Sequence, residues 1–194
     1  ITDSGTFTVG GTSSFTTAAA NATINLGQLA STGAVSLATN GGNADATVTN
    51  ATALDLGTVT VGDNLVATAT LGNITDSGVI TVGGTSSFTT TAANATILLD
   101  QVSSFTGAVS LATNGTTADA TLINSAIALD LGTVTVGRNL VATATTGTIT
   151  DSGVITVAGT SSFTTAANDQ AITLDSANAM TGAVTFTTAT AAGN

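Results

Sequence analysis

The sequence predicts an all-β fold in which parallel strands stack into a β-solenoid, or parallel β-helix. The segment LDLGTVTVGDNLVATATLGNITDSG, residues Leu54–Gly78, returns almost letter for letter at Leu129–Gly153, as in repeat architectures. Within these segments apolar and polar residues alternate with a period of two, which is the strand signature. The 194 residues include no Pro, which would remove a hydrogen-bond donor from strands paired on both sides.

Three landmarks set the length of the super-repeat. They are ITDSG at Ile1, Ile74 and Ile149, GTSSFTT at Gly11, Gly84 and Gly159, and TGAV at Thr32, Thr106 and Thr181. The ITDSG landmarks lie 73 and then 75 residues apart. No unrelated segment intervenes, so we expect one continuous solenoid over residues 1–194. Because the chain opens inside a repeat, we expect it to be a fragment of a longer one.

Each super-repeat is expected to divide at its Gly and Asp corners into three coils of unequal length, or about eight coils in all. The expected coils are Thr6–Gln28, Leu29–Gly57 and Thr58–Gly78, with second copies at Val79–Gln101, Val102–Gly132 and Thr133–Gly153. Alignment of the coils predicts that Phe88 stacks on Ala67 and that Phe163 stacks on Ala142. All six Phe are expected to lie in the layered core.

Composition favours many thin layers over one compact core. Thr makes up about one residue in four, and there are six Phe but no Trp or Tyr. A hydrophobic content of 42% is nevertheless too high for a disordered polar tract. The absence of Cys and His excludes disulfides, thiolate metal sites and the usual general base.

The charge balance argues against binding to nucleic acids or to anionic lipid. Eleven acidic residues, all Asp, face the single cation Arg138, for a net charge of −10. No stretch approaches the eighteen or so apolar residues of a membrane-spanning helix, so no such span is expected.

Asp residues near the ends of successive coils are the candidate site residues. They are Asp55, Asp76, Asp100, Asp130, Asp151 and Asp175. If they align, they form a carboxylate ladder with a spacing of about 4.8 Å. Turn capping through Asx hydrogen bonds is the favoured interpretation, and calcium binding is the alternative. Asp76 and Asp151 could be out of register with the others by one residue.

No catalytic or cofactor-binding residue is predicted, because nearly every polar residue recurs in its sister copy whereas a catalytic site breaks a repeat. The replacement of Asp63 by Arg138 is interpreted as exposed turn variation. A carbohydrate-active solenoid built on clustered carboxylates is a weaker alternative. An ice-binding Thr array is another, and we expect that array to be interrupted at every third coil.

The segments LDLGTVTVGDNLVATATLGNITDSG, VITVGGTSSFTT and TGAVSLATN resemble the repeat arrays of filamentous-haemagglutinin-like exoproteins. These are large bacterial adhesins of two-partner secretion systems, and the resemblance covers essentially the whole chain. It implies a right-handed parallel β-helix shaft, exported by an outer-membrane transporter and found outside the cell or at a bacterial surface. The family's secretion domain is not among these residues.

From the resemblance and the repeats together we expect the non-catalytic structural shaft of a secreted surface adhesin. The alternative is a segment of an extracellular filament or of a biofilm-matrix fibre, which would associate with its own copies end to end or laterally.

Overall fold

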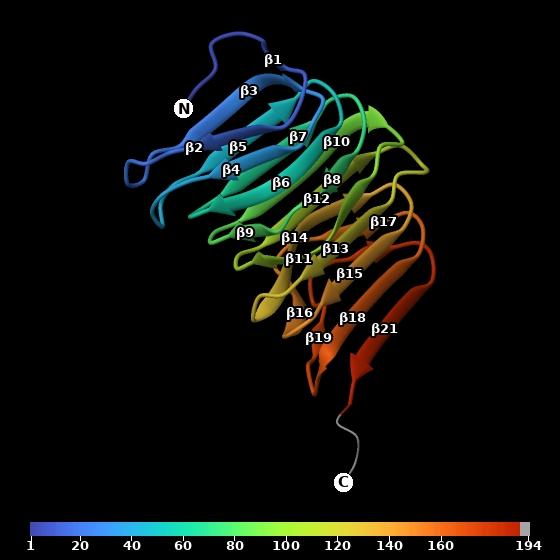
Figure 1. Cartoon of the computed structure of the whole chain (residues 1–194). Coiled ribbons are helices and arrows are strands. Elements are labelled where there is room, and N and C mark those ends of the chain that lie inside the picture. Colours follow the sequence, from blue (N-terminus) through green and yellow to red (C-terminus); the bar gives the residue numbers. More distant parts are fainter. Residues whose placement is uncertain (191–194) are drawn as a thin grey trace.

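Parallel strands that stack one coil upon the next form the whole fold, seen in a computed structural model that describes residues 1–190 (Figure 1). The predicted β-solenoid is confirmed, with about nine coils of about 21 residues. Residues 1–190 contain no helix, and so none that could cross a membrane. Residues 191–194 of the predicted array lie outside the described part.

The chain passes alternately through two long sheets. Sheet I has eleven strands: β1 (Phe7–Val9), β3 (Ile24–Ser31), β5 (Ala46–Asn50), β7 (Leu65–Ala69), β10 (Ser86–Ala93), β12 (Val109–Asn114), β14 (Ala128–Val136), β16 (Thr148–Asp151), β17 (Ile155–Val157), β19 (Ile172–Thr173) and β20 (Ala179–Met180). Sheet II has ten strands: β2 (Ser13–Thr16), β4 (Val35–Ala38), β6 (Leu54–Val61), β8 (Ile74–Asp76), β9 (Ile80–Val82), β11 (Ile97–Phe105), β13 (Ala120–Asn124), β15 (Leu140–Ala144), β18 (Ser161–Asn168) and β21 (Val184–Ala189).

The super-repeat does not divide into three coils as expected. The GTSSF strands show this directly, because β2 and β18 lie in sheet II whereas β10, the copy between them, lies in sheet I. One super-repeat from residue 74 makes seven passes through the sheets, namely β8 with β9, then β10, β11, β12, β13, β14 and β15. Seven passes are about three and a half coils, so each sister copy is placed half a turn further around the axis.

We call each crossing of a sheet by the chain a pass, and passes are of two kinds, bent and straight. A bent pass pairs as two segments, as when the first half of β6 pairs with β8 and its second half with β9. A straight pass pairs as one segment, as β7 does with β10. Two straight passes follow one another at β4 and β5 and again at β12 and β13, and at these places the stack of bent passes changes sheet.

We call these two places joint 1 and joint 2. At each joint a bent pass must pair with a straight one, and the strand register shifts in both sheets. The shifts lie between β3 and β5 and between β4 and β6 at joint 1, and between β11 and β13 and between β12 and β14 at joint 2. The extra residues of the bent pass form a bulge, as expected where two residues oppose one.

Apolar side chains of alternate residues fill the interior between the sheets. Phe88 pairs with Ala67, and Phe163 with Ala142, so both predicted stacks of large on small are confirmed. The ring of Phe88 meets that of Phe105 edge-on, with centroids 5.7 Å apart. These aromatic rings compensate in volume for the small residues in the neighbouring coils.

The prediction that all six Phe are core residues holds for three of them. Phe88, Phe105 and Phe163 are fully buried, but Phe7 and Phe186 are 47% and 56% exposed. The exposed pair lies in the first and last described coils, which have a neighbouring coil on one side only. Phe15 is partly buried.

Asn50 and Asn124 close the two joints from inside the solenoid, where both are fully buried. The amide oxygen of Asn50 accepts the Ser31 N–H at 2.8 Å, and its amide nitrogen donates to the Ser31 carbonyl at 2.9 Å. Asn124 binds the N–H and carbonyl of Phe105 in the same way, at 2.9 and 3.3 Å. A side-chain amide thus takes the place of the peptide group that the shorter pass lacks.

Replacement of Asn124 by Ala is expected to lower the free energy of unfolding by about 2 to 4 kcal/mol, because buried peptide groups of Phe105 lose their partners. Urea denaturation followed by circular dichroism measures the loss. The control is Asn25→Ala at an exposed position of β3, which should change stability by less than about 0.5 kcal/mol. Equal effects of the two substitutions would contradict the role of Asn124.

Candidate functional site

Polar side chains at the ends of passes bind the backbone of the adjacent coil. Asp76 ends β8 and points inward, with only 7% of its surface exposed. Its carboxylate accepts the N–H of Asp100 at 3.0 Å and that of Gln101 at 3.2 Å. Asp3, the first-copy sister of Asp76, likewise accepts N–H groups of Gly27 and Gln28, at 3.0 and 2.7 Å. The Asp of each ITDSG motif therefore caps the bend of the next coil.

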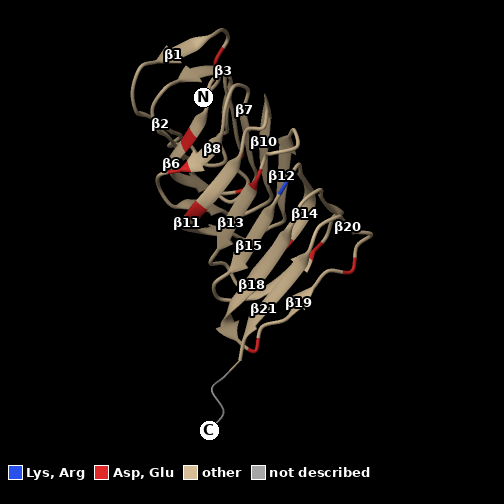
Figure 2. Cartoon of the chain, turned by 90° about the vertical axis from the view of Figure 1, so that its right-hand side faces the viewer, with Lys and Arg blue, Asp and Glu red and all other residues tan. Residues whose placement is uncertain are grey.

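The six candidate Asp residues do not form one ladder. Asp55, Asp76 and Asp100 lie in strands of sheet II, whereas Asp130 and Asp151 lie in sheet I and Asp175 follows β19 of that sheet (Figure 2). The half-turn between sister copies separates the two sets.

Within a set the expected shift of one residue is present. Asp55 pairs with Thr75, so that Asp76 pairs with Leu56. Asp130 and Asp151 differ in the same way, because Asp130 pairs with Thr150. Within residues 1–190, no group of three or more acidic side chains is arranged to hold a metal ion.

Burial dominates the acid–base chemistry of Asp76. It raises the pKa of the carboxyl from 3.8 to about 6, and the neighbouring charge of Asp100 raises that pKa further, while the hydrogen bonds from the backbone oppose the shift. The folded state therefore binds a proton at Asp76 more tightly than the unfolded chain does.

Asp151, the sister of Asp76, shows the opposite shift. Burial disfavours its charged form too, but a 2.6 Å hydrogen bond from the amide of Asn178, with N–H groups of Asp175 and Ser176, outweighs that effect and lowers the pKa. At the position of Asn178 the second copy carries Ser103, whose hydroxyl accepts the N–H of Ile80 as the Asn178 amide oxygen accepts that of Ile155, but Ser103 has no amide group to donate to Asp76. One substitution between copies thus changes the ionisation of a repeated Asp.

Arg138 is more than turn variation. It forms a two-pronged ion pair with Asp119, and that pair lowers the pKa of Asp119. In the first copy the corresponding residues are Asp63 and Asp45, so two like charges lie on adjacent coils. Arg138 therefore lies in an exposed turn, as interpreted from the sequence, and makes an ion pair there.

Outward threonines form columns that run along the axis. On sheet I, successive paired positions are Thr49, Thr68, Thr89, Ala112, Thr135 and Thr156. The column is interrupted at Ala112 and again three coils later at Ala179, which pairs with Thr156, so the expected interruption at every third coil is present in this column.

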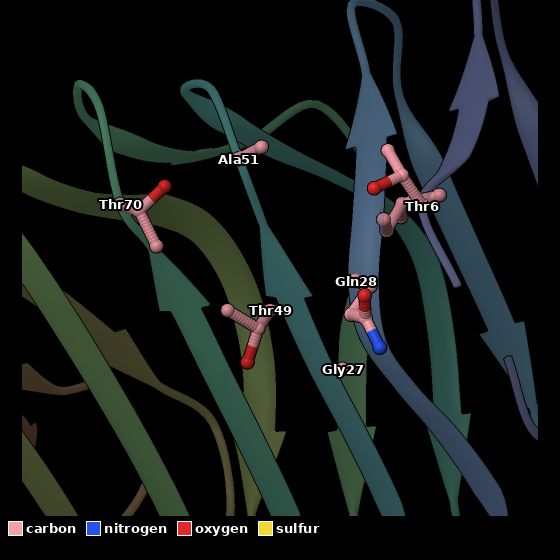
Figure 3. Close-up of a pocket in the computed structure, with 7 residues that line it drawn as sticks. Thr6, Gly27, Gln28, Thr49, Ala51 and Thr70 are labelled. Atoms are coloured by element: carbon pink, nitrogen blue, oxygen red, sulfur yellow. The ribbon is translucent and has the colours of Figure 1, made fainter. Parts of the chain in front are cut away.

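A notch lies beside each joint. There the second half of a bent pass, in β3 or β11, pairs with the preceding coil but has almost no partner in the following coil. Notch 1, of about 230 Å³, is lined by Thr6, Gly27, Gln28, Leu29, Thr49, Ala51 and Thr70 (Figure 3). Notch 2, of about 370 Å³, is lined by Ser104, Thr106, Ala126, Ile127 and Ala128. Neither lining contains an ionisable side chain.

Sequence reasoning missed the residues that form the joints. Asn50 and Asn124 stand at the same place in both copies, in ATVTN and ATLIN, at the last position of a strand. An Asn at a strand end is ordinary in a turn, so this signal does not distinguish a buried amide from an exposed one. The notches were missed because they follow from the order of bent and straight passes.

The chain matches the family described as "Repeats of unknown function (DUF5649)" over residues 41–112 and again over residues 117–187. The two matched segments cover most of the chain, which therefore belongs to this family of repeats. No curated protein and no solved structure matches the chain.

The free energy of unfolding is expected to fall as the pH rises from about 4 to about 6. Because the folded state raises the pKa of Asp76, protonation of this group favours folding, and that contribution is lost through this window. Urea denaturation at a series of pH values measures the slope, and carbon-detected NMR of the carboxyl measures the pKa. Asp76→Asn should remove this component of the slope.

Asp151→Asn is the matched control for this titration. Its lowered pKa means that Asp151 favours folding at pH values above the unfolded pKa and loses that contribution in acid. An Asp76 carboxyl that titrates near 4, as in a free peptide, would refute the assignment.

Asp63→Arg is expected to form an ion pair with Asp45 and to stabilise the fold by about 0.2 to 1 kcal/mol at low salt. The gain should shrink as salt screens the pair. Thermal unfolding at low and high ionic strength checks it, and Asp63→Asn separates the relief of like charges from the new pair. The idea fails if Arg at this position stabilises no more than Asn does.

Proposed function

We propose that this member of the DUF5649 repeats is the structural shaft of a secreted bacterial surface adhesin or exoprotein, and that it carries no catalytic site. The observation behind the proposal is the unbroken stack of parallel strands along both sheets, through about nine coils. In such a stack each coil buries its apolar face only against its neighbours, so stability grows with the number of coils. Rigidity and length are then the product of the fold.

The use of polar side chains supports a mechanical role. Asp3, Asp76 and Asp151 cap bends, and Asn50 and Asn124 close joints. These groups are engaged by the backbone, which leaves them poorly suited to act on a substrate. A hydrolase would instead need two free carboxylates at a fixed separation across a groove.

The proposed location is outside the cell or at its surface, with export through an outer-membrane transporter of the two-partner type. The resemblance to filamentous-haemagglutinin-like repeats motivates both parts. A chain with no Cys has no thiol that an oxidising exterior could oxidise. The alternative is a segment of an extracellular filament or biofilm-matrix fibre.

The test changes the length of the shaft in the full-length protein. Deletion of residues 74–148 removes about three and a half coils and should shorten the rod by about 17 Å at a spacing of about 4.8 Å per coil. Electron microscopy measures the length, and surface labelling of intact cells measures display. A length unchanged by the deletion, or a protein retained inside the cell, would overturn the proposal.

A further inference from the structure

Ile127 is the most exposed of the large hydrophobic side chains in residues 1–190, at 93%. It lies between β13 and β14, where the second copy has the letters SAIA and the first copy has ATA. The loop of joint 2 is thus one residue longer than the loop of joint 1. The longer loop carries an aliphatic side chain into solvent beside notch 2, which is unfavourable for an isolated shaft.

Notch 1 has the character of a receptor for such a side chain. Ala51 supplies exposed apolar surface, the side chains of Thr6, Gln28 and Thr49 stand around it (Figure 3), and Leu29 in the lining is itself fully buried. The absence of ionisable residues from its lining favours a neutral occupant over a charged one. A volume of about 230 Å³ accommodates an aliphatic side chain together with part of its loop.

A chain cannot fill its own notch. Ala51 lies where the chain leaves sheet I after β5, and Ile127 lies where it leaves sheet II after β13. The two features are therefore at opposite corners of the cross-section and one super-repeat apart along the axis. We call the protruding Ile127 the knob. Because the knob and notch 1 lie on opposite sides of the chain, their contact with other copies is heterologous and does not close, so copies add without limit.

We propose that Ile127 of one shaft inserts into notch 1 of a second copy, so that shafts associate side by side with an axial offset of about 17 Å, the rise of three and a half coils. This partner assignment rests on the proposed role as a shaft. The offset is the axial distance between joint 1 and joint 2, to which the notch and Ile127 belong, and the half-turn between the joints places the two features on opposite sides.

The faces beside the knob and the notch supply the remaining contact area, since one side chain buries far less than the roughly 1,200 Å² of a stable interface. Outward residues of β5, β7, β10 and β12 on sheet I are uncharged, as are those of β13, β15 and β18 on sheet II. Sheet I beside notch 1 can therefore meet sheet II beside Ile127 without burying a charge. The net charge of −10 still repels copies at a distance, so association should strengthen with salt.

Disulfide trapping tests the contact, because the chain has no Cys of its own. Gln28→Cys with Ile127→Cys places one thiol at the notch and one at the knob, both at exposed positions. Oxidation is expected to give a ladder of dimers, trimers and longer species, several-fold more abundant than in the control Gln28→Cys with Val102→Cys. Ladders of equal strength in both variants would overturn the proposal.

Sedimentation velocity on the unmodified chain provides the second readout. Oligomers should appear as salt rises, and Ile127→Asp should abolish them while the circular dichroism spectrum stays the same. Dispersed monomers at every salt concentration would overturn lateral association, although rods in electron micrographs would leave the shaft itself intact. Binding of a soluble disaccharide such as maltose in notch 1 of a chain that stays monomeric would also overturn it.

Discussion

Backbone hydrogen bonds that run along the axis are the interaction on which the other features depend. Each pass donates to and accepts from both neighbouring coils, as when the N–H of Leu65 bonds to Thr85 and that of Thr70 to Asn50, so a residue must find its partner one coil away or leave a buried peptide group unpaired. Coils of equal length satisfy this condition without adjustment. The coils here vary, since Ala46 pairs with Leu65 but Ser86 pairs with Val109, and the polar corners and joints absorb the difference.

The joints show how that condition is met when the pattern of passes changes. Asn50 and Asn124 supply amide groups where a strand is missing. On the other sheet Gly57 and Gly132 lie where a Cβ would come within 2.6 Å of the hydroxyl of Ser36 or Ser110. An amide on one side and a missing side chain on the other let bent and straight passes meet. The same geometry opens the notches, so stability and surface shape have one cause.

An odd number of passes has consequences for a long array. Each super-repeat turns its successor by half a turn, and equivalent faces therefore alternate between the two sides of the shaft. The half-turn places Asp76 and its sister Asp151 in opposite sheets, while their pKa shifts of opposite sign follow from local contacts, above all the hydrogen bond from Asn178 to Asp151. A tandem array of such units is two-sided, which suits a shaft that contacts neighbours on both flanks.

Strand alternation and local strand pairing were predictable from the sequence, and the half-turn between successive super-repeats was not. The stacks of Phe88 on Ala67 and of Phe163 on Ala142 followed from matching apolar positions across a corner, which uses only neighbouring segments. The division into three coils failed because the expected boundaries at Gln28, Gly57 and Gly78 are bends inside bent passes, and the segment between Gln28 and Gly57 crosses joint 1, where the bends change sheet. The burial of Asn50 and Asn124 depends on that same change of sheet.

The central claim is that coils of about 21 residues, and not of about 25, build the solenoid. Val66 pairs with Ser87 in adjacent strands of sheet I, whereas a coil of about 25 residues would place Val66 beside Thr91. The chain has no native Cys, so the most direct measurement is disulfide formation in two double variants. One carries Val66→Cys and Ser87→Cys, and the other carries Val66→Cys and Thr91→Cys. Only adjacent residues reach disulfide geometry. The account predicts a rapid intramolecular disulfide in the first variant and none in the second, and the reverse result would contradict it.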